Sequence, residues 1–332
     1  MGGFDSGSPA SGGGGELGWE PIYPKWTEDI DNRTGFSKAR INELKSKISQ
    51  NPFELIDCNT INNLNANDGN GPIFPRIASY QVPLSVINRI SYIRSLAPNW
   101  HVDNFNIESL TNAYGAAVNC DFFSVRIKKM PMGLSPKEFL EYFRKNINTF
   151  ISPDVNVEFS PFRSGSFDDT RHFNNDFKNS LGSLIHINMA NDVSVIISDY
   201  QNSTAPAAER HYFKFSTIKT PLDNEHPVAG NREFGIYEDP SKRGEYIFYI
   251  SAVDRAWDPT FDFVFKFFGA FKKGDELWEN VQINIAEFIN RGFGIAEFDP
   301  SKNITRRPNW EDVQDYLLGK ITYQELKTKL GC

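Results

Sequence analysis

The segment HPVAGNRE, residues 226–233, combines four kinds of side chain that could act on a ligand. It brings an imidazole, an amide, a guanidinium and a carboxylate into one short stretch of chain. Such a set could hold an anion through Arg232 and transfer a proton through His226. Asp254 follows the strand-like run EYIFYISAV, and it is expected at the same end of the sheet if the two neighbouring strands form a hairpin. His226, Arg232 and Asp254 are therefore the candidate catalytic residues.

The same residues also have a purely structural interpretation. Proline and glycine commonly shape a hairpin loop, and in such a loop Arg232 would pair with Glu225 or Glu233. Asp254 would likewise form an ion pair within the sheet with its neighbour Arg255. One loop without a second group of known geometry does not decide between the two interpretations, so both stay open at this point.

A second polar group, Asp168, Asp169, Arg171 and His172, has the side-chain types of metal ligands at short spacing. It falls in the segment RSGSFDDTRHFNND, where no helix or strand is expected to hold these side chains in place. A solvated loop is the favoured interpretation, and neither a metal nor a cofactor is predicted. The sequence also lacks G-x-S-x-G, H-E-x-x-H, Walker and G-x-G-x-x-G motifs in the required contexts.

Aromatic residues are the strongest compositional signal, with 28 Phe, 12 Tyr and 6 Trp in 332 residues. They favour β-rich packing, in which broad rings cover a pleated surface. Six phenylalanines between 261 and 271 form a stripe that alternates like one face of a strand, and core packing is its simplest role. On a curved sheet the same rings would line an apolar pocket. The candidate ligand-binding residues are Phe263, Phe265, Phe267, Trp278 and Tyr249.

Charge and composition exclude several classes of protein. The net charge of −7 argues against a nucleic-acid partner, because phosphate binding needs concentrated Lys and Arg. No segment approaches the ~20 apolar residues of a membrane span, and no secretory signal peptide is present. A cytoplasmic location, or export by a route that needs no such signal, is expected. Cys58, Cys120 and Cys332 are odd in number and show no metal-ligand spacing, which predicts free thiols.

Hydrophobic periodicity predicts an α+β fold. Alternating residues indicate a strand at 123–127, and the capping box Ser135–Glu138 opens a helix at 136–150. Short turns suit antiparallel neighbours, so we expect a curved antiparallel sheet of about six to eight strands with a long helix packed on it. The further strands are expected at 155–159, 184–188, 193–199, 211–218, 233–238 and 245–252, the long helix at 275–291, and a helical hairpin at 309–318 and 322–329.

Four regions follow from this pattern. Residues 1–18 form a Gly- and Ser-rich tether, which suggests a module that is part of, or tethered to, a larger protein. Residues 19–118 form a mostly helical region, with helices expected at 38–50, 84–96 and 107–117. Residues 119–300 hold the sheet and its long helix, and residues 301–332 hold the C-terminal hairpin.

The order of strand, helix, five or six antiparallel strands and a long closing helix resembles the START-like helix-grip fold. The run HPVAGNREFGIYE…GEYIFYISAVDRA also looks like a run found in some uncharacterised START-like bacterial domains. The resemblance covers about half of the chain. It implies a curved sheet that wraps the last helix and encloses an apolar cavity.

Three hypotheses about function follow. The first is a binding module for an apolar or amphipathic small molecule in a pocket between sheet and helix. The second is an enzyme domain, such as a delivered effector or toxin, that uses His226, Arg232 and Asp254. The third is a protein interaction module, whose sign would be an exposed aromatic patch.

Overall fold

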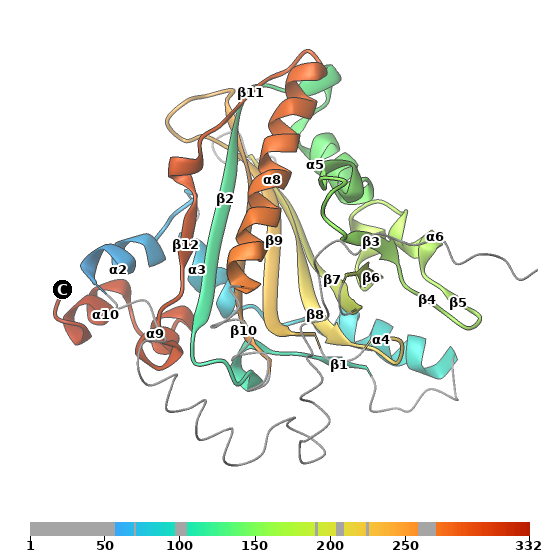
Figure 1. The fold of residues 1–332 in the computed structure, drawn as a ribbon, viewed down its shortest axis with the longest axis horizontal. Helices are drawn as coiled ribbons and strands as arrows, with labels where there is room; N and C mark the ends of the chain where they lie inside the picture. Colours follow the sequence, from blue (N-terminus) through green and yellow to red (C-terminus); the bar gives the residue numbers. More distant parts are fainter. Residues whose placement is uncertain are drawn as a thin grey trace, which may run out of the picture.

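The computed structural model describes residues 57–69, 71–96, 105–189, 192–203, 209–223, 226–257 and 270–332. The tether, the helix expected at 38–50 and the phenylalanines from 261 to 268 lie outside these ranges. Figure 1 shows an antiparallel sheet with helices on both faces. Its strands are β1 (Asn106–Ile107), β2 (Val118–Lys129), β3 (Glu158–Pro161), β6 (Leu184–Asn188), β7 (Val193–Ser203), β8 (Arg210–Lys219), β9 (Val228–Glu238), β10 (Tyr246–Ala256), β11 (Ile295–Phe298) and β12 (Ile304–Arg306).

The sheet is larger than the sequence predicts. Within the described ranges it has ten strands, in the order β11-β2-β10-β9-β8-β7-β6-β3, with β1 added to β8 and β12 added to β2. The α+β class, the antiparallel pairing and the long helix on the sheet are confirmed. The expected count of six to eight strands is too low, because β1, β11 and β12 are only two to four residues long and carry no periodic signal.

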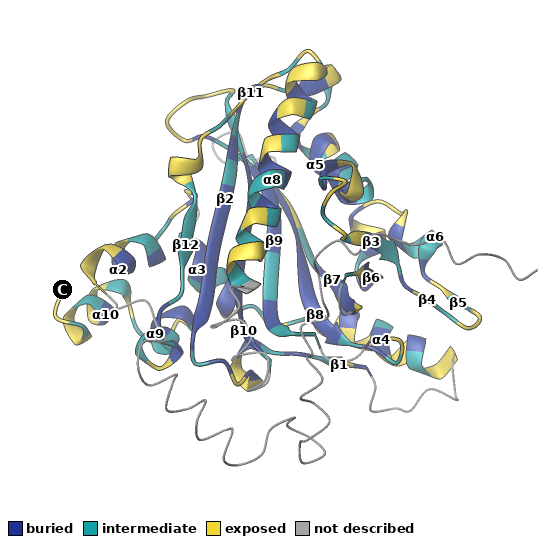
Figure 2. Cartoon of the chain, viewed as in Figure 1, coloured by how far each residue is buried: buried dark blue, intermediate teal, exposed yellow. Residues whose placement is uncertain are grey.

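Two helices cover one face of the sheet. These are α5 (Pro136–Lys145), followed by the 3₁₀ turn η5 (Ile147–Phe150), and the long helix α8 (Ala270–Arg291). Their buried sides turn toward the sheet in Figure 2, and their outer sides are exposed. The capping box at Ser135 forms as the sequence predicts, with both reciprocal hydrogen bonds present. We call this side the α8 face.

The opposite face carries several further helices. The helices α2 (Cys58–Leu64), α3 (Ile73–Ala78), α9 (Trp310–Leu317) and α10 (Tyr323–Lys329) share one apolar cluster with β2 and β10. The helix α4 (Leu84–Leu96) packs on β6, β7 and β8 in another cluster. The helix expected at 107–117 is wrong: β1 and the 3₁₀ turn η3 (Leu110–Asn112) occupy this stretch, and β1 pairs with β8.

The remaining elements are short. A two-stranded ribbon, β4 (Arg163–Ser164) and β5 (Phe167–Asp168), precedes the one-turn helix α6 (Thr170–Phe173). Three further 3₁₀ turns, η4 (Pro131–Gly133), η6 (Lys178–Ser180) and η7 (Pro300–Lys302), connect longer elements. Among the described helices, none has the length and hydropathy that a membrane crossing requires.

A disulfide bond joins Cys58 at the start of α2 to Cys332 at the end of the chain. The prediction of free thiols is therefore wrong for these two residues. They lie 274 positions apart, so no local spacing could reveal the pair, and the packing of α2 beside α10 brings them together. The third cysteine, Cys120, keeps its thiol and is buried in β2.

We expect the disulfide to stabilise the fold. A bond that closes so long a loop restricts the unfolded chain, and its loss typically costs about 2 to 5 kcal/mol. The double variant C58S/C332S should lose about this much in urea denaturation, and reduction of the wild-type protein should have the same effect. Alkylation of the unfolded, unreduced protein should label one cysteine, and labelling of all three would contradict the bond.

Candidate functional site

Four polar side chains meet on the α8 face of the sheet. We call Asn119, Asp121, Arg232 and Asp254 the Asp254 cluster. Strand pairing places them: Asp254 lies opposite Asn119, and Ala252 lies between Asp121 and Arg232 on the neighbouring strands. Because the side chain of Ala252 is small, the guanidinium of Arg232 can reach across β10 to the carboxylate of Asp121.

The two carboxylates of the cluster have unequal surroundings. Asp121 accepts two hydrogen bonds from Arg232, at 3.1 and 2.9 Å, and further bonds from the backbone of Ala252 and the amide of Asn119. Asp254 accepts one long hydrogen bond of 3.4 Å from Asn119 and lies 3.7 Å from Arg232. Both aspartates are buried. Arg232 is therefore the ion-pair partner of Asp121, whereas the carboxylate of Asp254 has few hydrogen-bond donors.

This difference sets the protonation of Asp254. Burial raises its pKa to about 7, and the nearby charge of Asp121 acts in the same direction. Arg232 and the hydrogen bond from Asn119 lower the pKa, but they do not offset the burial. A carboxyl group with this pKa exchanges its proton at neutral pH, as a general acid or base does.

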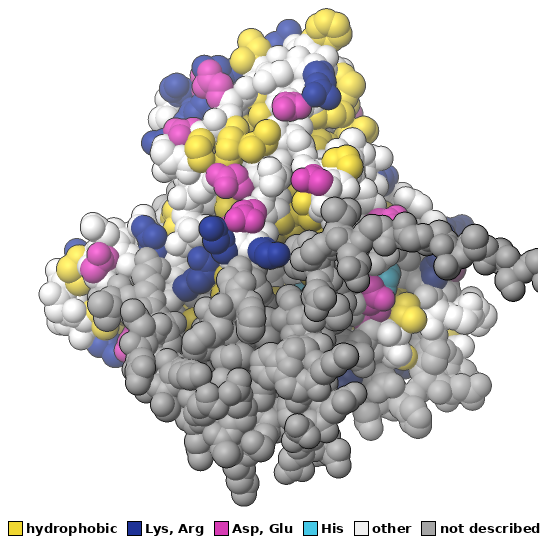
Figure 3. Space-filling model, viewed as in Figure 1, with side chains coloured by type: hydrophobic (Ala, Val, Ile, Leu, Met, Phe, Trp, Pro, Cys, Tyr) yellow, Lys and Arg dark blue, Asp and Glu magenta, His cyan; other side chains and the backbone are white. Residues whose placement is uncertain are grey.

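The cluster lies beneath the first turns of α8. The guanidinium of Arg232 sits 4.6 Å from the ring centre of Trp278, and one helical turn earlier Asp275 pairs with Arg307 at 2.5 Å. Burial also raises the pKa of Asp275. Lys and Arg side chains lie near this end of α8 in Figure 3, with Asp and Glu side chains beside them. On the first turns of the helix, the exposed Lys272 pairs with Glu276.

The structure brings together two of the three candidate catalytic residues. Arg232 and Asp254 are neighbours, whereas the hydrogen bonds of His226 run elsewhere: its backbone N–H donates to Glu108, and its Nδ1 lies 2.8 Å from the carbonyl of Val228. Burial lowers the pKa of His226 to about 4, and the charge of Arg232 adds to this effect. The imidazole is therefore neutral at pH 7, and its role in proton transfer stays a prediction.

The candidate ligand-binding residues do not share one surface. Trp278 packs on Phe234 of the α8 face with ring centres 5.6 Å apart. Tyr249 points to the opposite face, is fully buried and donates its hydroxyl to Glu233 at 2.5 Å. One pocket cannot include both rings. Phe263, Phe265 and Phe267 lie outside the described residues.

The space between α8, α5 and the sheet is filled with aromatic rings. Phe213 stacks on Phe234 with centres 4.8 Å apart, and Phe143 lies 5.0 Å from Phe248. Such distances are those of packed aromatic pairs. Trp278 is the ring of this face that contacts both the aromatic core and the Asp254 cluster.

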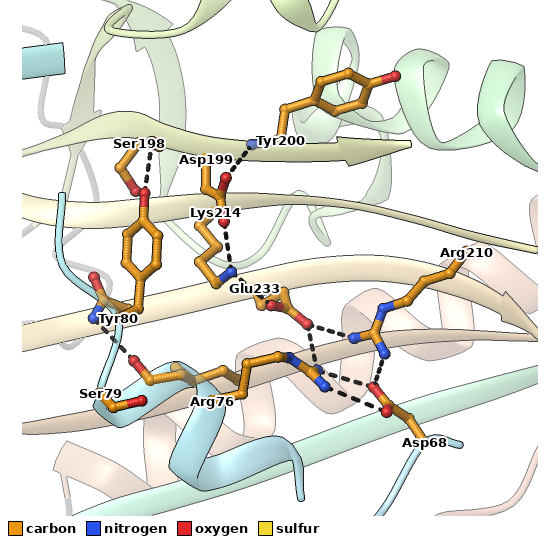
Figure 4. Close-up of polar contacts among 12 residues, drawn as sticks. Asp68, Arg76, Ser79, Tyr80, Ser198, Asp199, Tyr200, Arg210, Lys214 and Glu233 are labelled. Atoms are coloured by element: carbon orange, nitrogen blue, oxygen red, sulfur yellow. Dashed lines mark hydrogen bonds and ion pairs between the residues drawn. The ribbon is translucent and has the colours of Figure 1, made fainter. Parts of the chain in front are cut away.

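A buried ionic network lies on the opposite face of the sheet (Figure 4). Its centre is Glu233, which meets Arg76 at 2.8 Å, Arg210 at 3.0 Å and Lys214 at 3.0 Å. Asp68 pairs with both arginines, and Asp199 pairs with Lys214. Three cations thus face three carboxylates, and charge is balanced. The network ties α3 and the Asp68 turn to the sheet, which is a structural role.

The polar group at 168–172 has no common centre. Asp169 is buried, where it pairs with Arg89 at 2.6 Å and accepts a hydrogen bond from the backbone of Leu184. Asp168 is exposed, and His172 contacts the carbonyl of Leu181. The interpretation as a solvated loop is therefore wrong for Asp169, which anchors α4 to the sheet.

The site includes residues that the sequence reasoning missed. Asn119 and Asp121 stand at inward positions of β2, where Phe123 and the next alternate residues are apolar. A polar residue at such a position breaks the strand pattern, and this break was the available signal. No protein-family model matches the chain, and no curated protein matches it either.

Proposed function

We propose that this α+β domain is an acid–base enzyme that binds a small amphipathic molecule at the Asp254 cluster. One observation carries the proposal. Two buried carboxylates lie side by side, one with four donors and the other with a single long hydrogen bond. Paired titratable groups with such different environments are typical of acid–base sites.

The cluster favours a ligand with a hydrogen-bond donor. The Oδ1 atom of Asn119 is buried and has no hydrogen-bond partner, and Asp254 has unused acceptor capacity. An amine or hydroxyl group would satisfy both acceptors. Proton transfer between that group and Asp254 would be the chemical step.

Arg232 acts on Asp254 through its charge. Its guanidinium is held by the bidentate contact with Asp121 and by the face of Trp278, so it presents a fixed positive charge to Asp254. This charge limits the rise in the pKa of Asp254 that burial causes. His226 stays a predicted, more distant member of the site, and the charge of Arg232 contributes to the lowering of its pKa.

The apolar part of the ligand would meet Trp278. This ring is almost fully buried and separates the Asp254 cluster from the aromatic core. The long helix on an antiparallel sheet supports the helix-grip resemblance, in which ligands lie between the two. In this domain the hydrogen-bond acceptors for a ligand are those of Asn119 and Asp254, at the polar end of the space between α8 and the sheet.

A thermal-shift screen tests the proposal. Small amines and alcohols with an apolar part are assayed at pH 7, and a ligand present at 100 times its Kd should raise the Tm by about 5 °C. Asp254→Asn should then lower kcat for the converted compound at least about 100-fold, with a smaller change in KM. Asp154→Asn, at an exposed position, is the matched control. Equal turnover by Asp254→Asn and wild type would contradict the proposal.

A further inference from the structure

His186, Asp192 and Asp223 form a separate group of side chains away from the Asp254 cluster. One potential ligand atom from each lies within 4.8 Å of those of the other two, and this is the one such group of three among the described residues. His186 is on β6 and Asp192 immediately precedes β7, its neighbour in the sheet. Asp223 follows β8, which pairs with β7. The sheet thus positions all three side chains.

Asp223 is the buried member of the group. Its Oδ2 accepts a hydrogen bond from the hydroxyl of Ser194 and lies 3.0 Å from Nδ1 of His186, and its backbone N–H donates to Oγ1 of Thr220. Its Oδ1 is buried and has no hydrogen-bond partner. Among the described residues no Lys or Arg pairs with this carboxylate.

An unpartnered carboxylate oxygen is costly inside a protein. Burying a charge without a partner costs several kcal/mol, so such groups are usually paired or bind a metal. A hydrogen-bonded Asp–His pair accounts for Oδ2 but leaves Oδ1 without a partner. A cation that reaches both residues would satisfy the carboxylate, and this observation points to a ligand rather than to a purely structural pair.

We propose that His186, Asp192 and Asp223 bind a divalent transition-metal ion of the Zn²⁺ class. An imidazole with two carboxylates suits zinc and its neighbours, whereas Mg²⁺ and Ca²⁺ prefer all-oxygen sites. Neighbouring ligand atoms around Zn²⁺ lie about 3 to 3.5 Å apart, given metal–ligand bonds of about 2.1 Å.

The two aspartates approach different nitrogens of the imidazole. Nδ1 of His186 lies 3.0 Å from Oδ2 of Asp223, and Nε2 lies 3.8 Å from Oδ1 of Asp192. One ion binds only one of these nitrogens, so the side chain of Asp192 must turn toward the same nitrogen to complete the site. The side chain of Asp192 is 54% exposed and can rotate, so it closes the site from the solvent side. Ser194 and its hydrogen bond hold the carboxylate of Asp223 in place, as outer contacts do for metal ligands.

Calorimetric titration of the full, chelator-treated chain with ZnCl₂ at pH 7 tests the site. We expect one Zn²⁺ per chain, and Mg²⁺ in excess should not displace it. Asp192→Asn should weaken binding at least about tenfold, because a charged ligand is lost. Since Asp192 is exposed, this variant should fold like the wild type, which its Tm will show. His186→Gln should weaken binding further.

Asp154→Asn is the matched control, because it removes an exposed carboxylate outside the group. It should leave the Zn²⁺ affinity unchanged. Failure of the wild-type chain to bind Zn²⁺ would overturn the proposal. Equal binding by wild type and Asp192→Asn would also overturn it, since the ion would then lie elsewhere in the chain.

Discussion

Replacing Glu233 by glutamine should lower the free energy of unfolding by about 3 to 5 kcal/mol, because it leaves buried cations without their shared carboxylate. The ammonium of Lys214 and the guanidiniums of Arg76 and Arg210 all face this residue. Glutamine keeps the shape of the side chain, so the loss measures charge rather than packing. With domain stabilities of about 5 to 15 kcal/mol, this loss is a large fraction of the total.

The pKa of Glu233 gives an independent estimate of the same effect. Burial alone would raise it, but Lys214, Arg76 and Arg210 lower it to about 2. A carboxylate whose pKa is lower in the folded state stabilises the fold above its unfolded pKa of 4.5, and this stabilisation is lost as the pH falls toward 2. At about 1.4 kcal/mol per unit, the contribution is about 3 kcal/mol.

Urea denaturation at pH 7, followed by tryptophan fluorescence, measures the loss. Glu297→Gln is the control: this carboxylate pairs with Lys128 at the surface and is 56% exposed. Exposed pairs contribute at most about 1 kcal/mol, so the control should change little. If the two variants lost equal stability, the network would not hold α3 to the sheet.

Local patterns predicted the long elements of the fold. The strand at 123–127, the capped helix beginning at Pro136 and the long helix ending at Arg291 all appear, since alternation, capping and apolar stripes are properties of neighbouring residues. The added strands β11 and β12 could not be predicted in this way. They are strands because β2 offers hydrogen-bonding groups at its edge, and this partner is distant in sequence.

The candidate site was only partly visible in the sequence for the same reason. The segment 226–233 alone points to Arg232, but the partner of this residue, Asp121, is 111 positions away. What the sequence does contain is an irregularity: Asp121, Arg232 and Asp254 each stand on the inward face of a strand whose other inward residues are largely apolar. These three polar residues lie on three strands that pair with one another, so they meet at one place in the sheet. Only the order of the strands shows that they meet.

Replacing Asp254 by asparagine should stabilise the protein at pH 8, which is unusual for a buried charged residue. Its pKa is raised from 3.8 to about 7 in the folded state, chiefly by burial. Between these values the folded protein keeps a proton that the unfolded chain has lost, so stability falls as the pH rises. Above pH 7 the loss is complete and amounts to about 4 kcal/mol at most. Asparagine has no such charge to bury.

The free energy of unfolding of Asp254→Asn, relative to that of the wild type, should therefore increase by about 3 kcal/mol between pH 5 and pH 8. Urea denaturation at both pH values measures it. Asp121→Asn is the contrasting variant: it removes the bidentate partner of Arg232 and should destabilise the protein by about 3 kcal/mol or more at both pH values. If Asp254→Asn stabilises the protein at pH 8 while Asp121→Asn destabilises it, the charge of Asp254 lowers the stability of the fold. Functional residues often have this effect. Equal destabilisation at pH 8 would instead make Asp254 a structural partner of Arg232, and the acid–base role would be lost.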